Sequence, residues 1–320
     1  MPARPAPLDG PLRFDARRDL RDLVPLLRLG FGSDLSPQDL RWLDDLSRIS
    51  GPSLTLHSLA SRMPGGSEAT GQVYYVDGQL VGNISAFRCG PDLWVLANVV
   101  THPAWRRQGI AQALLRLTLQ DLGRRGARQV QLQVRAENGA AQRIYRGLGF
   151  WSMNAVTVLR RQAGLAAWQL TPALGPGLRL QALRHRDARA ARELLELCGL
   201  TARGGPSGPL AQAVEQGWLD QVDDWLCGRR RRSLLLRQGR QAVAAGTLFL
   251  TGPMSGGRLD LAVHPHWRGE VEAALLDPLL RQADVLGAAD LEAEVDVHES
   301  ATLEALGRVG FQRQRVLERL

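Results

Sequence analysis

The sequence predicts a mixed α/β fold that occurs twice along the chain, and three observations lead to this prediction. An apolar run at residues 93–100 is followed by a short loop and a helical pattern that starts near Ile110. Asp77-Gly78, a favoured two-residue hairpin turn, separates two strand-like segments. His102-Pro103-Ala104-Trp105-Arg106 also returns in altered form at residues 264–268, 162 positions later. In a chain of 320 residues, such a repeat predicts two domains of the same kind.

Charge and composition exclude several classes of protein. The net charge is +8 at pH 7, and every basic residue is arginine. The densest run, Arg229–Arg232, is expected to be a solvated loop before a strand that starts near Ser233. The arginines alternate neither with aromatic side chains nor with a recognition-helix pattern, so the sequence does not favour nucleic acid as a partner.

Membrane and metal sites are not predicted either. No apolar run is long enough to span a bilayer, so we expect no membrane partner. The three cysteines are Cys89, Cys198 and Cys227, and they form no Cys-x-x-Cys pair. This favours neither zinc nor a disulfide framework, and it predicts a reducing, cytoplasmic location without a metal site.

The first half begins with a disordered lead at residues 1–10 and then alternates strands and helices. Ser36, followed by Pro37 and Asp39, has the pattern of a helix start. Residues 51–71 are rich in Ser, Gly and Pro and are expected to form a loop. The predicted strands are 12–14, 72–76, 80–87, 93–100, 129–134 and 155–159, and the first helix is 19–29.

The loop after the 93–100 strand is suited to bind a phosphate. The first N–H groups of a helix have no internal partners and carry partial positive charge. Gly109 would let the backbone approach an anion closely, and Arg106 and Arg107 would supply forked donors.

Two segments together resemble the GNAT superfamily of N-acetyltransferases. Arg106-x-x-Gly109-x-Ala111 after a strand is similar to the family's pyrophosphate loop. Asn138-x-x-Ala141-x-x-Ile144-Tyr145-x-x-Leu148-Gly149-Phe150 resembles its second conserved segment. The resemblance implies two tandem GNAT folds, each with a mixed, mostly antiparallel central sheet flanked by helices. It also implies acetyl-CoA as the co-substrate.

The resemblance assigns expected roles to individual residues. Backbone groups of Val99, Val100 and Thr101 would polarise the acetyl carbonyl, and Tyr145 would protonate the departing thiolate. Tyr145 could instead be a core aromatic residue, and Asn138 either contacts the CoA arm or caps its helix. The residues expected to bind the co-substrate are Val99, Val100, Thr101, Arg106, Arg107, Gln108, Gly109, Ile110, Ala111, Asn138 and Ala141. No general base is identified: Glu137, Glu68 and His57 are each more typical of surface positions.

The second half is expected to be a degenerate copy. We place the catalytic domain at residues 11–161, a linker at 162–177 and the second domain at 178–320. When the two halves are aligned through Leu114-Leu115 and Leu275-Leu276, Glu270 corresponds to Gly109 and Glu272 to Ala111. Further along, Glu299 replaces Asn138 and Leu306 replaces Tyr145. Carboxylates at an anion site are repulsive. We therefore expect this half to bind acetyl-CoA poorly.

The combined prediction is a cytoplasmic N-acetyltransferase whose first half acetylates the primary amine of a small molecule or peptide. The arrangement resembles tandem GNAT proteins of the mycothiol-synthase type, although there the second half is the active one. A non-catalytic acyl-CoA sensor or scaffold is the alternative. The sequence does not choose the acceptor, the acyl chain length, or between monomer and homodimer.

Overall fold

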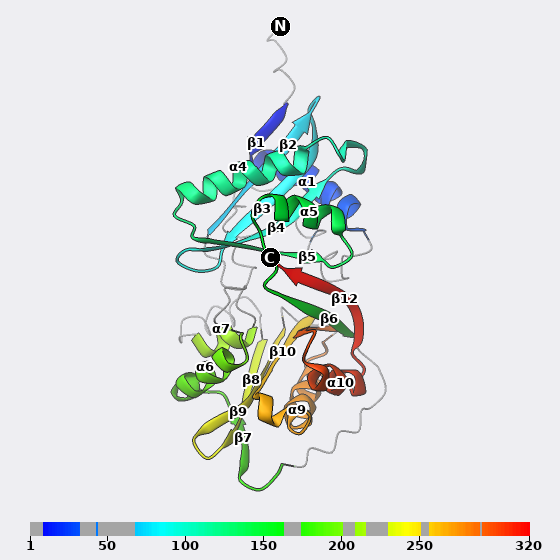
Figure 1. Ribbon diagram of the computed structural model, residues 1–320. Coiled ribbons are helices and arrows are strands. Elements are labelled where there is room, and N and C mark those ends of the chain that lie inside the picture. Colours follow the sequence, from blue (N-terminus) through cyan, green and yellow to red (C-terminus); the bar gives the residue numbers. More distant parts are fainter. Residues whose placement is uncertain are drawn as a thin grey trace. The chain divides into compact units, whose positions relative to one another are not determined.

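The chain forms two compact units in the computed structural model (Figure 1). The structure describes residues 9–32, 43, 68–162, 174–200, 209–215, 230–250, 256–288 and 290–320. The first unit contains the chain up to Gln133 together with Ala140–Phe150. The second contains Val134–Gly139 and Trp151–Leu320. Each unit is described by itself below.

The first unit is built on a mostly antiparallel sheet. Its strands are β1 (Gly10–Arg13), β2 (Glu68–Val76), β3 (Gln79–Arg88), β4 (Leu93–Thr101) and β5 (Gln129–Arg135). The last two residues of β5 are assigned to the second unit. They pair in chain order, antiparallel from β1 to β4 and parallel between β4 and β5. The predicted hairpin turn is confirmed, since Asp77 and Gly78 both have positive φ, at 50° and 79°. That pair of conformations is typical of a type I′ turn.

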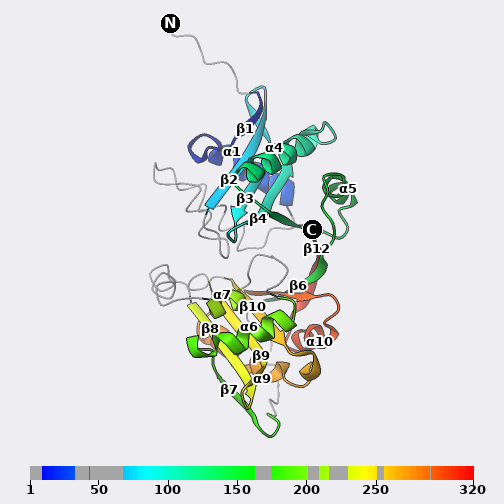
Figure 2. The same cartoon turned by 60° about the vertical axis from the view of Figure 1, so that its left-hand side comes forward.

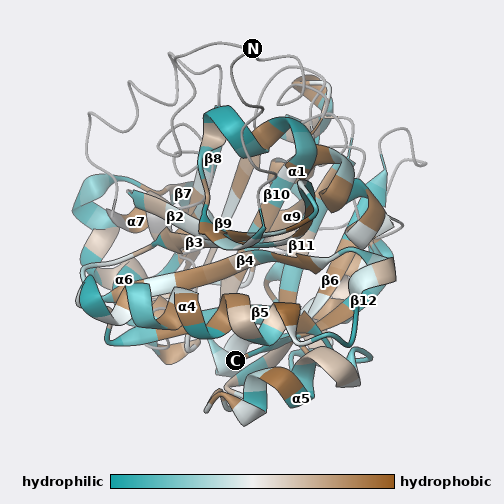
Figure 3. Cartoon of the chain, turned by 90° about the horizontal axis from the view of Figure 1, so that it is seen from above, coloured by the Kyte–Doolittle hydropathy of each residue, from teal (hydrophilic) through white to brown (hydrophobic). Residues whose placement is uncertain are grey.

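Helices cover both faces of this sheet. Helix α1 (Ala16–Phe31) packs on β3 and β4, and helix α4 (Ile110–Arg124) packs on β2, β3 and β4. Viewed from above, α1 and α4 lie on opposite sides of the strands, and α4 carries alternating hydrophobic and hydrophilic bands (Figure 3). A short 3-10 turn, η2 (Pro103–Trp105), connects β4 to α4, and α5 (Gly139–Gly147) follows β5.

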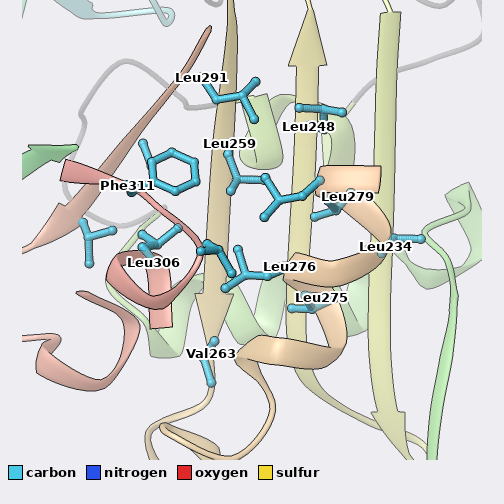
Figure 4. Close-up of a cluster of buried hydrophobic side chains, with 14 of the residues drawn as sticks. Leu234, Leu248, Leu259, Val263, Leu275, Leu276, Leu279, Leu291, Leu306 and Phe311 are labelled. Atoms are coloured by element: carbon cyan, nitrogen blue, oxygen red, sulfur yellow. The ribbon is translucent and has the colours of Figure 1, made fainter. Parts of the chain in front are cut away.

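The second unit repeats the pattern with a longer sheet. Its strands are β6 (Asn154–Gln162), β7 (Leu178–Ala182), β8 (Arg230–Gln238), β9 (Gln241–Leu250), β10 (Gly257–Val263), β11 (Asp290–Asp296) and β12 (Gln312–Arg319), in the order β12-β6-β11-β10-β9-β8-β7. Its helices are η3 (His185–Asp187), α6 (Ala188–Leu197), α7 (Pro209–Glu215), η4 (Pro265–Trp267), α9 (Glu272–Val285) and α10 (Ser300–Arg308). Helices α6 and α7 pack on β9 and β10 (Figure 2). Leucines of α9 and α10 meet strand side chains in one apolar core (Figure 4).

Both units hold a buried aspartate at the start of their first helical segment. Asp19 is fully buried and accepts hydrogen bonds from the Tyr75 hydroxyl at 2.9 Å and the Asp15 N–H at 2.7 Å. In the second unit Asp187 is also buried and accepts from Arg237 Nη1 at 2.8 Å and the Arg184 N–H at 3.1 Å. Buried carboxylates need such donors. A buried aspartate with side-chain and backbone donors at the same place in both halves agrees with the predicted duplication.

The division of the chain differs from the boundary expected near residue 161. Strand β6 pairs antiparallel with β11 on one edge and with β12 on the other. Its Arg161 is buried, donates from Nε to the Val309 carbonyl at 3.0 Å and lies 3.6 Å from the Asp284 carboxylate. These bonds make β6 part of the second unit, although the repeat in the sequence assigns it to the first half.

Two local expectations are also corrected. Arg230–Arg232 is not a loop but the start of β8, where Arg231 is held by the Pro209 carbonyl at 3.2 Å and lies over the Phe249 ring at 4.9 Å. The segment expected to be a loop up to Gly71 ends earlier, because β2 already begins at Glu68. The expected helix at Ser36, His57 and most of the expected linker lie outside the described residues.

Candidate functional site

The loop between β4 and α4 presents its charged residues to solvent. His102 caps the 3-10 turn, with its Nδ1 accepting from the Ala104 N–H at 3.2 Å. Arg106, Arg107, Gln108 and Gly109 are all exposed, and Ile110 is buried as the anchor of α4. Arg106 Nε donates to the Thr101 carbonyl at 3.4 Å, which directs this side chain back toward the end of β4. The loop therefore offers two cationic side chains beside a helix start.

The backbone of this loop is shaped to expose N–H groups. Gly109 is the N-cap of α4 with φ of 79°, and no side chain caps the helix. Arg107 also has positive φ, at 65°, which is uncommon for a residue with a Cβ. Such turns arrange successive N–H groups into an anion-binding concavity. A Cβ on Gly109 would meet nothing in the protein within 4 Å, so the preference for glycine comes from its positive φ and not from a neighbouring atom.

Strand β4 carries a bulge and then leaves the β5 ladder. The ladder joins Leu93–Leu96 to Gln129–Leu132 and ends there, although β4 continues to Thr101. Between the pairs Asn83–Val100 and Ser85–Ala97, β4 has one residue more than β3. Asn98 in this bulge has φ of 53°. Val99 is one of the two bulge residues, and Val99, Val100 and Thr101, the backbone expected to contact the acyl group, all lie beyond the last pair with β5.

Tyr145 of α5 lies in the same compact unit as this loop. Its side chain is buried, its ring meets Phe150 edge-on at 6.0 Å, and burial raises the pKa of its hydroxyl to about 12. In the described part of the chain the hydroxyl makes no hydrogen bond. A buried phenol of this kind stays neutral and remains available as an O–H donor.

The remaining expected residues are divided between the two units. Asn138 and Glu137 are exposed and belong to the second unit, and the Asn138 N–H donates to the Arg135 carbonyl at 3.0 Å. Ala141 is half-buried in the first unit. Glu68, considered as a base, instead pairs with Arg125 at 2.6 Å and Arg88 at 3.5 Å, so its carboxylate serves an ion-pair network.

In the second copy of the loop, carboxylates of the same unit already occupy the groups that correspond to the anion-binding donors. Val271 and Leu275 are buried like Ile110 and Leu114, which agrees with the register that places Glu272 opposite Ala111. Glu272 is buried, and both of its oxygens accept from the Gly269 N–H at 2.9 Å. Arg268 Nη2 donates to Glu299 Oε1 at 2.7 Å. Burial raises the pKa of Glu299, an effect that exceeds the opposing one of Arg268.

Two polar side chains near the bulge were not identified from the sequence. Asn83 is buried in β3 and its Nδ2 donates to the Asn98 carbonyl at 2.9 Å, yet its Oδ1 has no partner within the described residues. The Thr101 hydroxyl is likewise buried without a partner there. A single polar residue in an apolar strand pattern does not by itself predict a functional site. Only the folded structure shows that its side chain has no hydrogen-bond partner.

Comparisons with known proteins identify the first part of the chain. Residues 42–150 match the model of the acetyltransferase (GNAT) family. Over these residues the chain is similar to a GNAT domain. A stretch of 65 residues, 20% of this chain, is 40% identical to the [ribosomal protein bS18]-alanine N-acetyltransferase of Escherichia coli strain K12. The match covers 42% of that protein's length, and the same identity is found with its Shigella flexneri counterpart.

Solved structures show the same fold over nearly the whole chain. A GCN5-related N-acetyltransferase from Sphaerobacter thermophilus aligns with a TM-score of 0.67 at 18% identity, covering 98% of this chain and 95% of that one. A tandem GNAT protein from the clavulanic acid biosynthesis pathway aligns with a TM-score of 0.59 at 15% identity, covering 97% and 96%. The predicted α/β class with mostly antiparallel sheets and flanking helices is thereby confirmed.

Two features are absent from the residues that the structure describes. No helix in them is long and apolar enough to cross a membrane. They also contain no group of three or more His, Cys, Asp or Glu side chains placed to hold a metal ion.

Proposed function

We propose that the first unit transfers an acetyl group from acetyl-CoA to a primary amine of a small molecule or peptide. The observation that supports this most directly is the exposed, uncapped start of α4 beside Arg106 and Arg107, which follows the part of β4 that runs beyond its pairing with β5. Together these supply donors for a pyrophosphate and a break in the sheet for an extended chain. The GNAT match of residues 42–150 agrees with this use.

In the proposed reaction the amine attacks the thioester carbon directly. Backbone N–H groups of Val99 to Thr101, in the bulge and directly after it, would stabilise the oxyanion. The new C–N bond forms as the C–S bond breaks, and Tyr145 donates its proton to the departing sulfur. The proton of the acetylated amine leaves to water, which returns a proton to Tyr145. A phenol is protonated at neutral pH, and burial raises the pKa of Tyr145 further, to about 12.

The second unit is proposed not to bind acetyl-CoA. The groups that would contact a phosphate there already have carboxylate partners: the Gly269 N–H has Glu272 and Arg268 has Glu299. An entering phosphate would have to displace these carboxylates against charge repulsion.

Calorimetric titration of the purified chain with acetyl-CoA tests the binding part of the proposal. We expect one site per chain, which is lost in the double variant Arg106→Ala with Gly109→Glu. Arg268→Ala is the matched control, because it removes the corresponding arginine of the second loop. It should leave the stoichiometry at one, whereas a second site in the wild-type chain would contradict the silent second unit.

Turnover is tested by a panel of amines with acetyl-CoA. The E. coli relative is named for acetylating an alanine of a ribosomal protein, so a synthetic peptide that begins with alanine is the first probe. A polyamine, an amino sugar and an aminoglycoside complete the panel. Binding of acetyl-CoA without acetylation of any amine would instead favour the sensor or scaffold function.

A further inference from the structure

We propose that Asn83 is a positioning residue for the acceptor amine, with its Oδ1 accepting an N–H of that amine. This inference rests on the proposed function and extends it to the acceptor side of the site. It starts from a buried oxygen for which the described chain provides no donor.

The orientation of the Asn83 amide follows from its one strong hydrogen bond. Its partner at 2.9 Å is the Asn98 carbonyl, which can only accept, so the Asn83 atom facing it must be Nδ2. Oδ1 is therefore the oxygen without a partner. Asn83 is only 1% exposed, and a buried acceptor left without a donor is costly. Native structures keep such groups mainly where a ligand or an ordered water completes them.

The bond to Asn98 places Asn83 one peptide away from the expected reacting centre. The carbonyl of Asn98 and the N–H of Val99 belong to the same peptide group, and Val99 begins the backbone expected to polarise the thioester. Ser85 Oγ lies 3.4 Å from Nδ2 of both Asn83 and Asn98, so the three side chains form one uncharged polar cluster at the bulge. Such a cluster suits a neutral amine, the form that attacks.

The register of the sheet puts Asn83 on the side opposite the α4 helix. Its cross-strand partners are Val73 and Val100, and both belong to the apolar cluster that packs with α1. The neighbouring residue Gly82 faces the other way, since a Cβ there would lie 2.8 Å from Ile110 Cγ2 of α4. Thr101 pairs with Gly82 and shares that side.

The two unpartnered oxygens are thus on opposite faces of the sheet at the same level. The Thr101 hydroxyl lies on the face of α4, whose N-terminus is proposed to bind the co-substrate. Asn83 Oδ1 lies on the face of α1. One donor from each of the two substrates would satisfy both oxygens. Asn83 does not act as a base here; it holds the amine so that the lone pair points at the thioester carbon.

The test compares Asn83→Leu with Thr118→Val, and the probe is the alanine-initiated peptide followed by the other amines of the panel. Thr118 is a matched control because its hydroxyl is also fully buried without a partner in the described structure, but on α4. For Asn83→Leu we expect kcat/KM for the acceptor to fall about tenfold while acetyl-CoA affinity stays within about twofold. Thr118→Val should change neither.

The outcomes separate this proposal from the proposed function. Turnover by the wild-type chain with equal acceptor kinetics in Asn83→Leu and Thr118→Val would overturn the role of Asn83 and leave the function intact. Absence of turnover with every amine would contradict both the proposed function and the proposed role of Asn83. Asn83→Ala provides the same comparison if Asn83→Leu does not fold. Failure of both to fold, beside a folded Thr118→Val, would show that Asn83 is needed for the fold alone.

Discussion

At the scale of single residues, Tyr145 gives the sharpest prediction. Tyr145→Phe removes the proposed proton donor but keeps the ring that packs on Phe150. We expect kcat to fall by about a hundredfold while the dissociation constant of acetyl-CoA is unchanged, as measured by steady-state kinetics and calorimetry. A variant that keeps full turnover would show that the phenol is a core residue without a chemical role.

The same residue predicts the pH dependence of the reaction. The rate should rise with pH as the acceptor amine loses its proton, because only the neutral amine attacks. An acid with an ordinary phenol pKa would then lose activity above about pH 10. Burial raises the pKa of Tyr145 to about 12, so the proton donor persists and no descending limb is expected up to that pH. A fall in kcat/KM near pH 9, with the fold intact by circular dichroism, would contradict this.

Gly109 and Gly126 form a matched pair at the two ends of α4. Their φ values are 79° and 82°, and a Cβ on either would meet nothing within 4 Å. Changing either to Ala should lower stability similarly, by about 1 kcal/mol, because both force a Cβ into the left-handed region. Only Gly109→Ala should also weaken acetyl-CoA binding. Equal affinities for the two variants would argue against a phosphate at this helix start.

At the scale of elements, the two strand-to-helix loops share a buried anchor residue but differ in what occupies the start of the helix. Ile110 and Val271 anchor their helices in the same way, yet the first loop is open and the second is filled by Glu272. Glu272→Ala would leave the Gly269 N–H without its acceptor and remove a carboxylate from the start of α9. We expect a loss of about 1–2 kcal/mol in unfolding free energy, measured by denaturant titration.

Glu270→Ala is the control for that change, because Glu270 is exposed in the same loop. It should alter stability by less than about 0.5 kcal/mol. Equal effects of the two substitutions would mean that the contact with Gly269 contributes nothing specific.

At the scale of the whole molecule, strand β6 decides where the second unit begins. A fragment of residues 178–320 would lack the strand that lies between β11 and β12 and the buried Arg161. We expect it to aggregate, whereas a fragment of residues 151–320 should be soluble and show dispersed amide signals in an NMR spectrum. An equally well-folded shorter fragment would show that β6 is dispensable for the second sheet.

The sequence by itself determined the elements and the location of the proposed chemistry. Local spacing predicted the β2–β3 hairpin, strand β4, helix α4 and the loop around Gly109, because turn residues and amphipathic periods act over a few neighbours. It also predicted the degenerate second loop, since Glu270 and Glu272 follow from the internal alignment.

Only the tertiary structure decided which distant groups meet. Strand pairing across more than a hundred residues moved β6 into the second sheet, and the expected loop at Arg230–Arg232 became strand because it pairs with Leu248–Leu250 of β9. The carboxylates of Glu272 and Glu299 were visible in the sequence, but their partners Gly269 and Arg268 were not. The unpartnered oxygen of Asn83 has the same cause: hydrogen-bond satisfaction depends on neighbours that only the folded chain supplies.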